Sequence, residues 1–330
     1  MHELEKNGVD LVAIGGGTGL STLLSGLKKY VGAGVDGIAI RRLSAIVAVS
    51  DDGGSSGRLR DEFQMPPPGD IRNCMVALSE DSHLLSKLFK HRFSGDGQLA
   101  GHNFGNLFLA ALSEVTGDFA EAVRLSSEIL ASKGHIFPAT VSDVRIAARL
   151  TDGSVVQGET NISKTGGTIK RLYLEPEDCE PHPEAIAAIS KGHILTVGPG
   201  SLFTSILPPL LVNGVVDAIA ASSATKIFVC NLMTQPGETD GLTARRHLEI
   251  VREYAPGLNF DYVIVNNRPI SEIQSQLYTQ DGAEQIGVHG SIDSEVIEGA
   301  NVVYADLLDE GQLVRHSPAR LAKTVLRVGR

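Results

Sequence analysis

Cysteine is scarce in this sequence, and the three cysteines present are not spaced to work together. Cys74, Cys179 and Cys230 lie far apart and form no Cys-x-x-Cys pair. This spacing excludes a paired-cysteine redox motif and the usual zinc-binding motifs. Unpaired cysteines are typical of a reducing compartment, so we expect all three to be buried as small apolar side chains.

Excess positive charge and long apolar runs are missing as well. The chain carries 29 Lys and Arg against 39 Asp and Glu, a formal charge of −10. This balance argues against duplex nucleic acid or an anionic membrane as partner, because both demand a dense basic surface. No apolar run approaches the ~20 residues of a membrane span, and the polar residues 1–10 do not resemble a secretion signal. We therefore expect a cytoplasmic protein with no membrane span, and the sequence leaves a homo-oligomer open.

Several well-known catalytic and nucleotide-binding motifs are also absent. No Gly-Lys-Ser or Gly-Lys-Thr ending of a Walker loop occurs, and no glycine-rich loop completes the dinucleotide fingerprint. A nucleophile elbow would need a glycine two residues after Ser201, where the chain has Phe203. No Ser/His/Asp arrangement stands out either. An NAD-dependent oxidoreductase is therefore disfavoured, and we expect no tightly bound redox cofactor.

The chain alternates short β-branched runs with longer helical stretches. This pattern predicts an α/β fold with a Rossmann-like, mostly parallel sheet covered by helices on both faces. Between residues 144 and 174 the apolar period changes to two, which predicts an antiparallel β-meander inserted at about 140–175. We expect one domain over 1–330. The predicted strands of the main sheet are 10–14, 44–49, 193–197, 226–230, 261–265 and 301–305.

Glycine is abundant, at 36 of 330 residues, and it is concentrated in loops that follow predicted strands. Two such loops, 15–19 and 198–201, each lead from a strand into a helix, where backbone N–H groups and the helix dipole favour an anion. A tight strand–helix turn is the alternative for both. The predicted nucleotide or phosphate contacts are Gly15, Gly16, Gly17, Thr18, Gly19, Arg72, Asn73, His102, Asn103, Asn106, Gly198, Gly200, Ser201, Thr204 and Asn231.

Acidic residues follow the second predicted strand and precede a helix. Asp51 and Asp52 open the segment Asp-Asp-Gly-Gly-Ser-Ser-Gly, and Asp70 stands two residues before Arg72. Carboxylates at the end of a strand can bind a ribose or hold Mg²⁺ together with waters and phosphate oxygens. The alternatives are turn chemistry for Asp51 and Asp52 and helix capping for Asp70. Asp52 and Asp70 are the catalytic candidates, and all three aspartates are candidate Mg²⁺ ligands.

A further polar group opens an apolar helix. In the segment Gly-His-Asn-Phe-Gly-Asn, Asn103 and Asn106 lie three residues apart, where their amides could recognise a base or a sugar. His102 is as readily explained as a buried or capping residue. The segment 231–239 follows another predicted strand, and we expect Asn231 at the same edge of the sheet.

The motifs IGGGTGL, SDDGGSSGRLR, PPGDIRNC, GHNFGNL, GPGSLFTSILP and CNLMTQPGET, in this order, closely resemble the YvcK family. These bacterial proteins are called gluconeogenesis factors and are related to the archaeal phospholactate transferase CofD. The resemblance covers residues 9–322 and implies a modified Rossmann-like fold.

For function, the resemblance implies binding of UDP-activated sugars and a role in cell shape, cell-wall precursor metabolism and growth on gluconeogenic carbon. By motif, the loops 15–19 and 198–201 would surround phosphates, and Asp52 and Asp70 match acidic positions tied to metal and acceptor in the CofD branch. Our leading interpretation is a non-catalytic or weakly catalytic nucleotide-sugar-binding regulator. The alternative is a Mg²⁺-dependent CofD-like transferase that uses a nucleotide-diphosphate donor.

Overall fold

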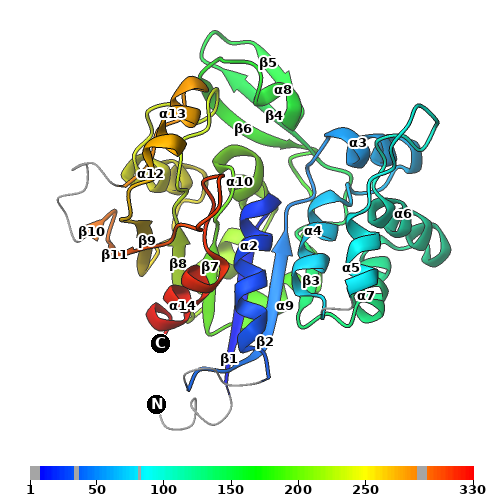
Figure 1. Cartoon of the computed structure of the whole chain (residues 1–330), viewed down its shortest axis with the longest axis horizontal. Helices are drawn as coiled ribbons and strands as arrows, with labels where there is room; N and C mark the ends of the chain where they lie inside the picture. The colour runs from blue at the N-terminus through cyan, green and yellow to red at the C-terminus, as the bar shows by residue number, and fades with distance from the viewer. Residues whose placement is uncertain (1–7, 33–36, 81–82, 288–295) are drawn as a thin grey trace.

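An eight-stranded sheet forms the centre of the computed structural model, which describes residues 8–32, 37–80, 83–287 and 296–330 (Figure 1). Residues 1–7, part of the segment used above to argue against a secretion signal, lie outside the described ranges. The strand order is β10-β11-β9-β8-β7-β1-β2-β3, and every neighbouring pair is parallel except β10 with β11. The strands are β1 (Val9–Gly15), β2 (Ile40–Val47), β3 (His135–Pro138), β7 (Ile194–Val197), β8 (Thr225–Val229), β9 (Tyr262–Asn266), β10 (Val296–Ile297) and β11 (Ala300–Ala305).

The predicted α/β fold with a mostly parallel sheet is confirmed. All six predicted strands are present, but β2 begins at Ile40 rather than at residue 44. Arg41 and Arg42 on this early part of β2 bind the buried carboxylate of Asp10 on β1. The pattern analysis missed these residues because charged side chains hide a strand from a search for apolar runs. It also missed β3 and β10, which are too short to give a periodic signal.

Helices cover the sheet. Figure 1 shows α2 in front of the sheet with α14 and α4 on either side of it, while α9 lies behind β1. All three cysteines are buried and free, as predicted. The helices and helical turns are α2 (Gly17–Leu27), η1 (Lys28–Tyr30), α3 (Gly54–Phe63), α4 (Gly69–Leu78), α5 (His83–Lys90), α6 (Phe104–Thr116), α7 (Phe119–Ile129), α8 (Glu159–Ile162), α9 (Pro183–Lys191), η2 (Leu202–Ile206), α10 (Leu207–Leu211), α11 (Val215–Ala221), α12 (Ala244–Tyr254), α13 (Glu272–Gln280) and α14 (Pro318–Val328).

A separate antiparallel sheet lies between β3 and β7 in the chain. It contains β4 (Arg145–Leu150), β5 (Val155–Gln157) and β6 (Ile169–Glu175), and we call residues 145–175 the insert. The predicted antiparallel insert is confirmed, but its strand order is β5-β4-β6, so the prediction of a meander was wrong. The short strand β5 leads directly into α8, and β6 then pairs with the other edge of β4. Figure 1 shows the insert above the sheet, at the end where β7 and β8 finish.

A buried arginine fixes the insert to the rest of the protein. The guanidinium of Arg60 on α3 is 1% exposed. It donates hydrogen bonds to the carboxylate of Asp143 at 2.7 Å and to the carbonyl of Val144 at 2.6 Å, immediately before β4. A buried guanidinium without these partners would be costly, so the first residues of the insert are held firmly against α3.

Among the described residues, no single helix is long and apolar enough to cross a membrane. The segments Leu202–Leu211 and Val215–Ala221 are long and apolar enough only when taken together, and the chain bends by 80° between them.

The contact between α2 and α14 gives a first prediction. A Cβ atom added at Gly26 would lie 2.0 Å from the carbonyl oxygen of Pro318, whereas one at Gly97 would meet nothing within 4 Å. Gly26→Ala must push the two helices apart, and we expect it to lower the free energy of unfolding by about 1–3 kcal/mol in urea titrations. Gly97→Ala is the matched control and should stay close to the parent. A Gly26→Ala protein as stable as this control would contradict the described packing.

Candidate functional site

Four neighbouring strands of the main sheet end at one edge. The carboxyl ends of β2, β1, β7 and β8, which are adjacent in the sheet, lead into residues 48–53, 15–19, 198–201 and 230–239. We call these four loops the rim. In parallel α/β sheets, ligands bind outside the carboxyl ends of strands, so the rim is the candidate site. The sheet therefore brings together loops that the sequence analysis considered separately.

Two glycine-rich loops of the rim pack directly on each other. A Cβ atom at Gly19 would lie 2.4 Å from the carbonyl oxygen of Pro199, and one at Gly200 would lie 3.0 Å from the Cβ of Ser205. Gly17 and Gly198 have φ values of +64° and +81°, which favour glycine. Part of the glycine pattern is therefore explained by close packing and turn geometry. Thr18, at the start of α2, remains exposed.

The first N–H group of α2 is already bound by a carboxylate. The backbone N–H of Gly17 donates a 2.6 Å hydrogen bond to Oδ2 of Asp70, which comes from α4. The N-cap position of α4 is Pro68, so the alternative interpretation, in which Asp70 caps its own helix, is wrong. Burial, followed by the charge of Asp51, raises the pKa of Asp70 to about 6. Asp70 thus links two helices at the centre of the rim.

Asp51 and Asp52 are neighbours in the chain but serve different parts of the structure. Asp51 accepts a 2.8 Å hydrogen bond from the N–H of Gly53, and burial raises its pKa. Asp52 turns to the insert, where its Oδ1 accepts hydrogen bonds from the backbone N–H and the hydroxyl of Thr160 at 3.0 and 2.9 Å. A carboxylate at this position caps the first turn of α8.

The three aspartates therefore do not form the predicted set of metal ligands. Within the described ranges, no group of three or more His, Cys, Asp and Glu side chains is arranged to hold a metal ion. The carboxylate of Asp52 is turned toward the insert, where it binds Thr160. Asp51 and Asp70 remain as a pair close enough for the charge of one to raise the pKa of the other.

The insert brings a further acid to this pair. Glu159, the first residue of α8, has its pKa raised to about 8 by burial and then by the charges of Asp51 and Asp70. Sequence analysis missed Glu159, because nothing in its local sequence distinguishes it from an ordinary surface acid. Glu238 of the rim accepts a 2.6 Å hydrogen bond from Ser163 of the insert. The insert thus contacts the rim through its α8 turn.

The positive charge of Arg72 acts on both Asp51 and Asp70. Burial and the nearby Arg92 lower its pKa, whereas Asp70 and Asp51 act in the opposite direction. One terminal nitrogen donates a 2.6 Å hydrogen bond to Oδ1 of Asn73, while the buried Nε has no partner among the described residues. The predicted neighbours Arg72 and Asn73 therefore lie together beside the acids, and the guanidinium retains an unused donor.

The predicted amide pair has a structural role. Oδ1 of Asn103 accepts hydrogen bonds from the N–H groups of Gly105 and Asn106 and so caps α6. The amide nitrogen of Asn106 donates to Ser55 and Ser56 on α3, and its Oδ1 has no partner among the described residues. Nδ1 of His102 lies 3.3 Å from the Ser55 hydroxyl, and burial lowers its pKa. These side chains join α6 to α3 beneath the rim.

The predicted residues after β7 and β8 also contact one another. Oδ1 of Asn231 accepts a 3.2 Å hydrogen bond from the N–H of Gly200, and Gln235 donates a 2.7 Å hydrogen bond to the hydroxyl of Ser201. The buried Thr204 side chain acts on Glu159 of the insert and partly offsets the rise in its pKa. Polar contacts therefore join the loops after β7 and β8, and Thr204 lies beside the insert.

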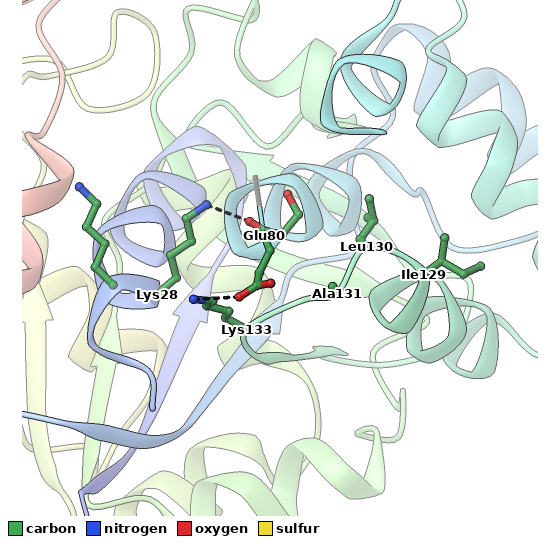
Figure 2. A pocket seen from close by; sticks show the side chains of 8 residues that line it. Lys28, Glu80, Ile129, Leu130, Ala131 and Lys133 are labelled. Carbon is green, nitrogen blue, oxygen red and sulfur yellow. Dashed lines mark hydrogen bonds and ion pairs between the residues drawn. The ribbon is translucent and has the colours of Figure 1, made fainter. Parts of the chain in front are cut away.

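A separate cavity of about 630 Å³ lies beside η1, at the opposite end of α2 from the rim (Figure 2). Three lysines line it, but two are engaged. Lys28 donates to the carbonyl of Ser79, and Lys133 pairs with Glu80, both at 3.0 Å. Because two of its three cations already have protein partners, the rim remains the better candidate site.

Comparison with known proteins agrees with the described geometry. A family model for "2-phospho-L-lactate transferase CofD" matches residues 11–308. A "Putative gluconeogenesis factor" of Nostoc sp. is 46% identical over 99% of this chain and 70% of its own length. The "Gluconeogenesis factor" of Bacillus subtilis is 40% identical over 96% of each chain. A crystal structure of a UPF0052-family protein from Bacillus halodurans superposes with a TM-score of 0.89 at 41% identity, covering 97% of this chain and 99% of that one.

The raised pKa of Glu159 predicts a pH dependence of stability. The folded protein holds this proton up to about pH 8, whereas the unfolded chain releases it near 4.5. Its contribution to stability is therefore complete below about pH 4.5 and is lost as the pH rises through 8. We would measure the free energy of unfolding in urea at about pH 5 and at about pH 8. Between these two pH values it should fall more for the parent than for Glu159→Gln. Glu114→Gln, an exposed control on α6, should keep the parent's slope, and equal slopes for all three proteins would contradict the placement of Glu159.

Proposed function

The chain belongs to the CofD/UPF0052 family, and from this premise we propose that it is a gluconeogenesis factor that binds a nucleotide-sugar at the rim. The Bacillus subtilis relative named above carries that name and is matched over 96% of its length, and the Nostoc relative, named as a putative one, over 70%. The observation that carries the proposal is the convergence of four strand-end loops, the N-terminus of α2 and Arg72 at one edge of the sheet. A nucleotide diphosphate has the charge and length to engage all of these groups.

The start of α2 supports phosphate binding. The first N–H groups of an α-helix have no partner within the helix. The N-cap residue of α2 is Gly16, which has no side chain to supply one. Asp70 binds the N–H of Gly17, which leaves those of Thr18 and Gly19 for a ligand. Arg72 lies beside Asp70, and its buried Nε has no partner among the described residues. Helix N–H groups with an arginine are a common arrangement around phosphate.

The acids support Mg²⁺ as a companion of the ligand. Mg²⁺ prefers one or two carboxylates completed by waters and phosphate oxygens, and Asp51 with Asp70 provides such a pair. Bound Mg²⁺ would also neutralise the charge between these carboxylates and a diphosphate. Asp52 binds the backbone of Thr160 in the insert. Its role would be to position α8, and it would not bind the metal ion.

The family model gives specific support to a second function. CofD is named as a 2-phospho-L-lactate transferase, and transfer of a phosphorus-containing group depends mainly on positioning and on neutralising charge. The alternative is therefore a Mg²⁺-dependent transferase with a nucleotide-diphosphate donor. We favour the regulator, which would act in the cytoplasm on cell-wall precursor metabolism and cell shape during gluconeogenic growth.

The binding proposal predicts a selective loss in Arg72→Gln. A UDP-sugar should stabilise the parent in thermal-shift and calorimetric titrations more than NAD or ATP does, and Arg72→Gln should bind it at least about tenfold more weakly, ~1.4 kcal/mol. Arg327 is an exposed arginine in the last turn of α14. Arg327→Gln removes the same charge outside the rim loops, and this variant should bind the ligand like the parent. Stabilisation by NAD alone, or equal affinity in both variants, would refute the proposal.

The choice between regulator and enzyme predicts the result of one assay. A nucleotide-diphosphate conjugate of phospholactate is incubated with a deazaflavin alcohol, with and without Mg²⁺, and product is followed by mass spectrometry. We expect no turnover, and we expect Asp52→Asn to keep nucleotide-sugar affinity within about tenfold. Mg²⁺-dependent product that disappears in Asp51→Asn would instead establish the transferase.

A further inference from the structure

A second groove lies on the insert, on the side of α12. It has a volume of about 710 Å³, and β6 forms one wall while the end of α12 and Leu211 of α10 form the other. The hydroxyl of Tyr254, the last residue of α12, accepts a 2.7 Å hydrogen bond from the N–H of Leu172. Figure 1 shows β6 with α10 and α12 nearby. The lining residues are Arg149, Lys170, Arg171, Leu172, Tyr173, Leu174, Glu177, Leu211, Glu253, Tyr254 and Pro256.

Positive charge is concentrated in this groove although the whole chain is acidic. Arg149 on β4 and Arg171 on β6 are directly opposite each other in the antiparallel register. Like charges at such a position destabilise a sheet. The register of this pair of strands shifts one residue further along, because Leu150 pairs with Ile169. Lys170 therefore has no residue opposite it on β4. Bulges of this kind re-aim a side chain and are frequent next to functional sites.

The acids of the groove do not balance these charges. Glu177 pairs with Arg171 at 2.9 Å. Glu253 is engaged by Arg246 of its own helix, at 2.8 Å. Neither Arg149 nor Lys170 makes an ion pair within the described ranges, and both are exposed. Two positive charges therefore face the groove without a counterion from the protein.

Two tyrosines complete the groove. The guanidinium of Arg171 lies over the ring of Tyr173, 5.7 Å from its centre, which restricts where this cation can go. Because the hydroxyl of Tyr254 accepts a hydrogen bond from Leu172, its own hydrogen remains available to donate. The groove thus offers two uncompensated cations, one positioned guanidinium and one hydroxyl donor.

From this arrangement we propose that the groove between β6 and α12 is a second ligand site, which binds the phosphate monoester of a small metabolite. A phosphate monoester carries a charge of about −1.5 to −2 at pH 7, which matches the two unpaired cations. The volume lies within the ~300–1,000 Å³ typical of small-molecule sites. A guanidinium can donate two parallel hydrogen bonds to two oxygens of one phosphate. Arg149 and Arg171 therefore suit phosphate binding better than lysines at the same positions would. The site does not depend on the function proposed for the rim.

A unique fluorophore can test this site directly. The chain contains no tryptophan, so Tyr173→Trp places a single indole in the groove. Titration with inorganic phosphate at constant ionic strength should give a saturable change in its emission. Adding Arg149→Gln and Lys170→Gln should weaken binding at least about tenfold. Adding Lys87→Gln and Lys90→Gln on α5, the control with the same change in net charge, should leave the affinity unaltered.

Wild-type protein provides a second measurement that needs no new side chain. The ³¹P NMR line of inorganic phosphate should broaden on addition of the parent, and less on addition of Arg149→Gln/Lys170→Gln than of the α5 control. The proposal would be overturned if sodium chloride changed the indole emission as much as phosphate does. It would also be overturned if the two double variants broadened the ³¹P line equally. Free O-phosphoserine should bind as well as phosphoserine within a short peptide. A peptide that binds while the free amino acid does not would also overturn it, in favour of a protein partner.

Discussion

The hydrogen bond between the N–H of Gly17 and the carboxylate of Asp70 is the contact around which the rim is organised. It joins the start of α2 to the first turn of α4, and it leaves no room for a side chain at Gly16, whose Cβ would lie 2.7 Å from the same carboxylate. Because Asp70 also lies near Asp51, Glu159 and Arg72, one carboxylate couples the helix N-terminus to these three charged groups. A change in the charge at Asp70 is therefore felt by each of them.

This arrangement carries a cost that a ligand can relieve. Asp51, Asp70 and Glu159 all have raised pKa values, because burial and mutual repulsion disfavour their charged forms. Perturbed groups of this kind cluster at functional sites. A diphosphate alone would add negative charge, whereas a diphosphate with Mg²⁺ would remove the repulsion. The proposed nucleotide-sugar would therefore bind these acids better as its Mg²⁺ complex than as a free anion.

The insert connects the acids to the rest of the fold. Arg60 fixes the chain before β4, and Asp52 and Glu238 hold α8 at the rim through Thr160 and Ser163. Glu159 reaches the site only because of these attachments. The side of the insert near α12 holds the separate basic groove, so one small sheet contributes to two places with opposite charge.

Most of the fold could be predicted from the sequence because apolar periodicity is a local signal. The runs that became β1, β7, β8, β9 and β11 are short, β-branched and bounded by glycine or polar residues, and the sheet then requires their loops to meet. The start of β2 and the strand β3 escaped this signal, since charged residues or brevity masked them. The predicted phosphate contacts remain a prediction, although the structure does bring most of them to the rim.

The orientation of single side chains could not be predicted in the same way. Nothing local to Asp52 indicates that it binds Thr160, 108 residues later in the chain, and nothing near Asp70 indicates that it binds α2 and does not cap α4. The prediction of amide recognition by Asn103 overlooked that an asparagine directly before an apolar helix usually caps it. Glu159 is far from every glycine loop in sequence, so only the folded insert reveals it.

A crystal structure of the protein with a UDP-sugar and Mg²⁺ is the sharpest test of the proposed site. We expect the diphosphate to lie against the backbone N–H groups of Thr18 and Gly19 and within hydrogen-bonding distance of Arg72, with Asp51 and Asp70 facing the metal ion. A diphosphate bound away from α2, with the Gly17–Asp70 contact and the surrounding rim unchanged and empty, would contradict it.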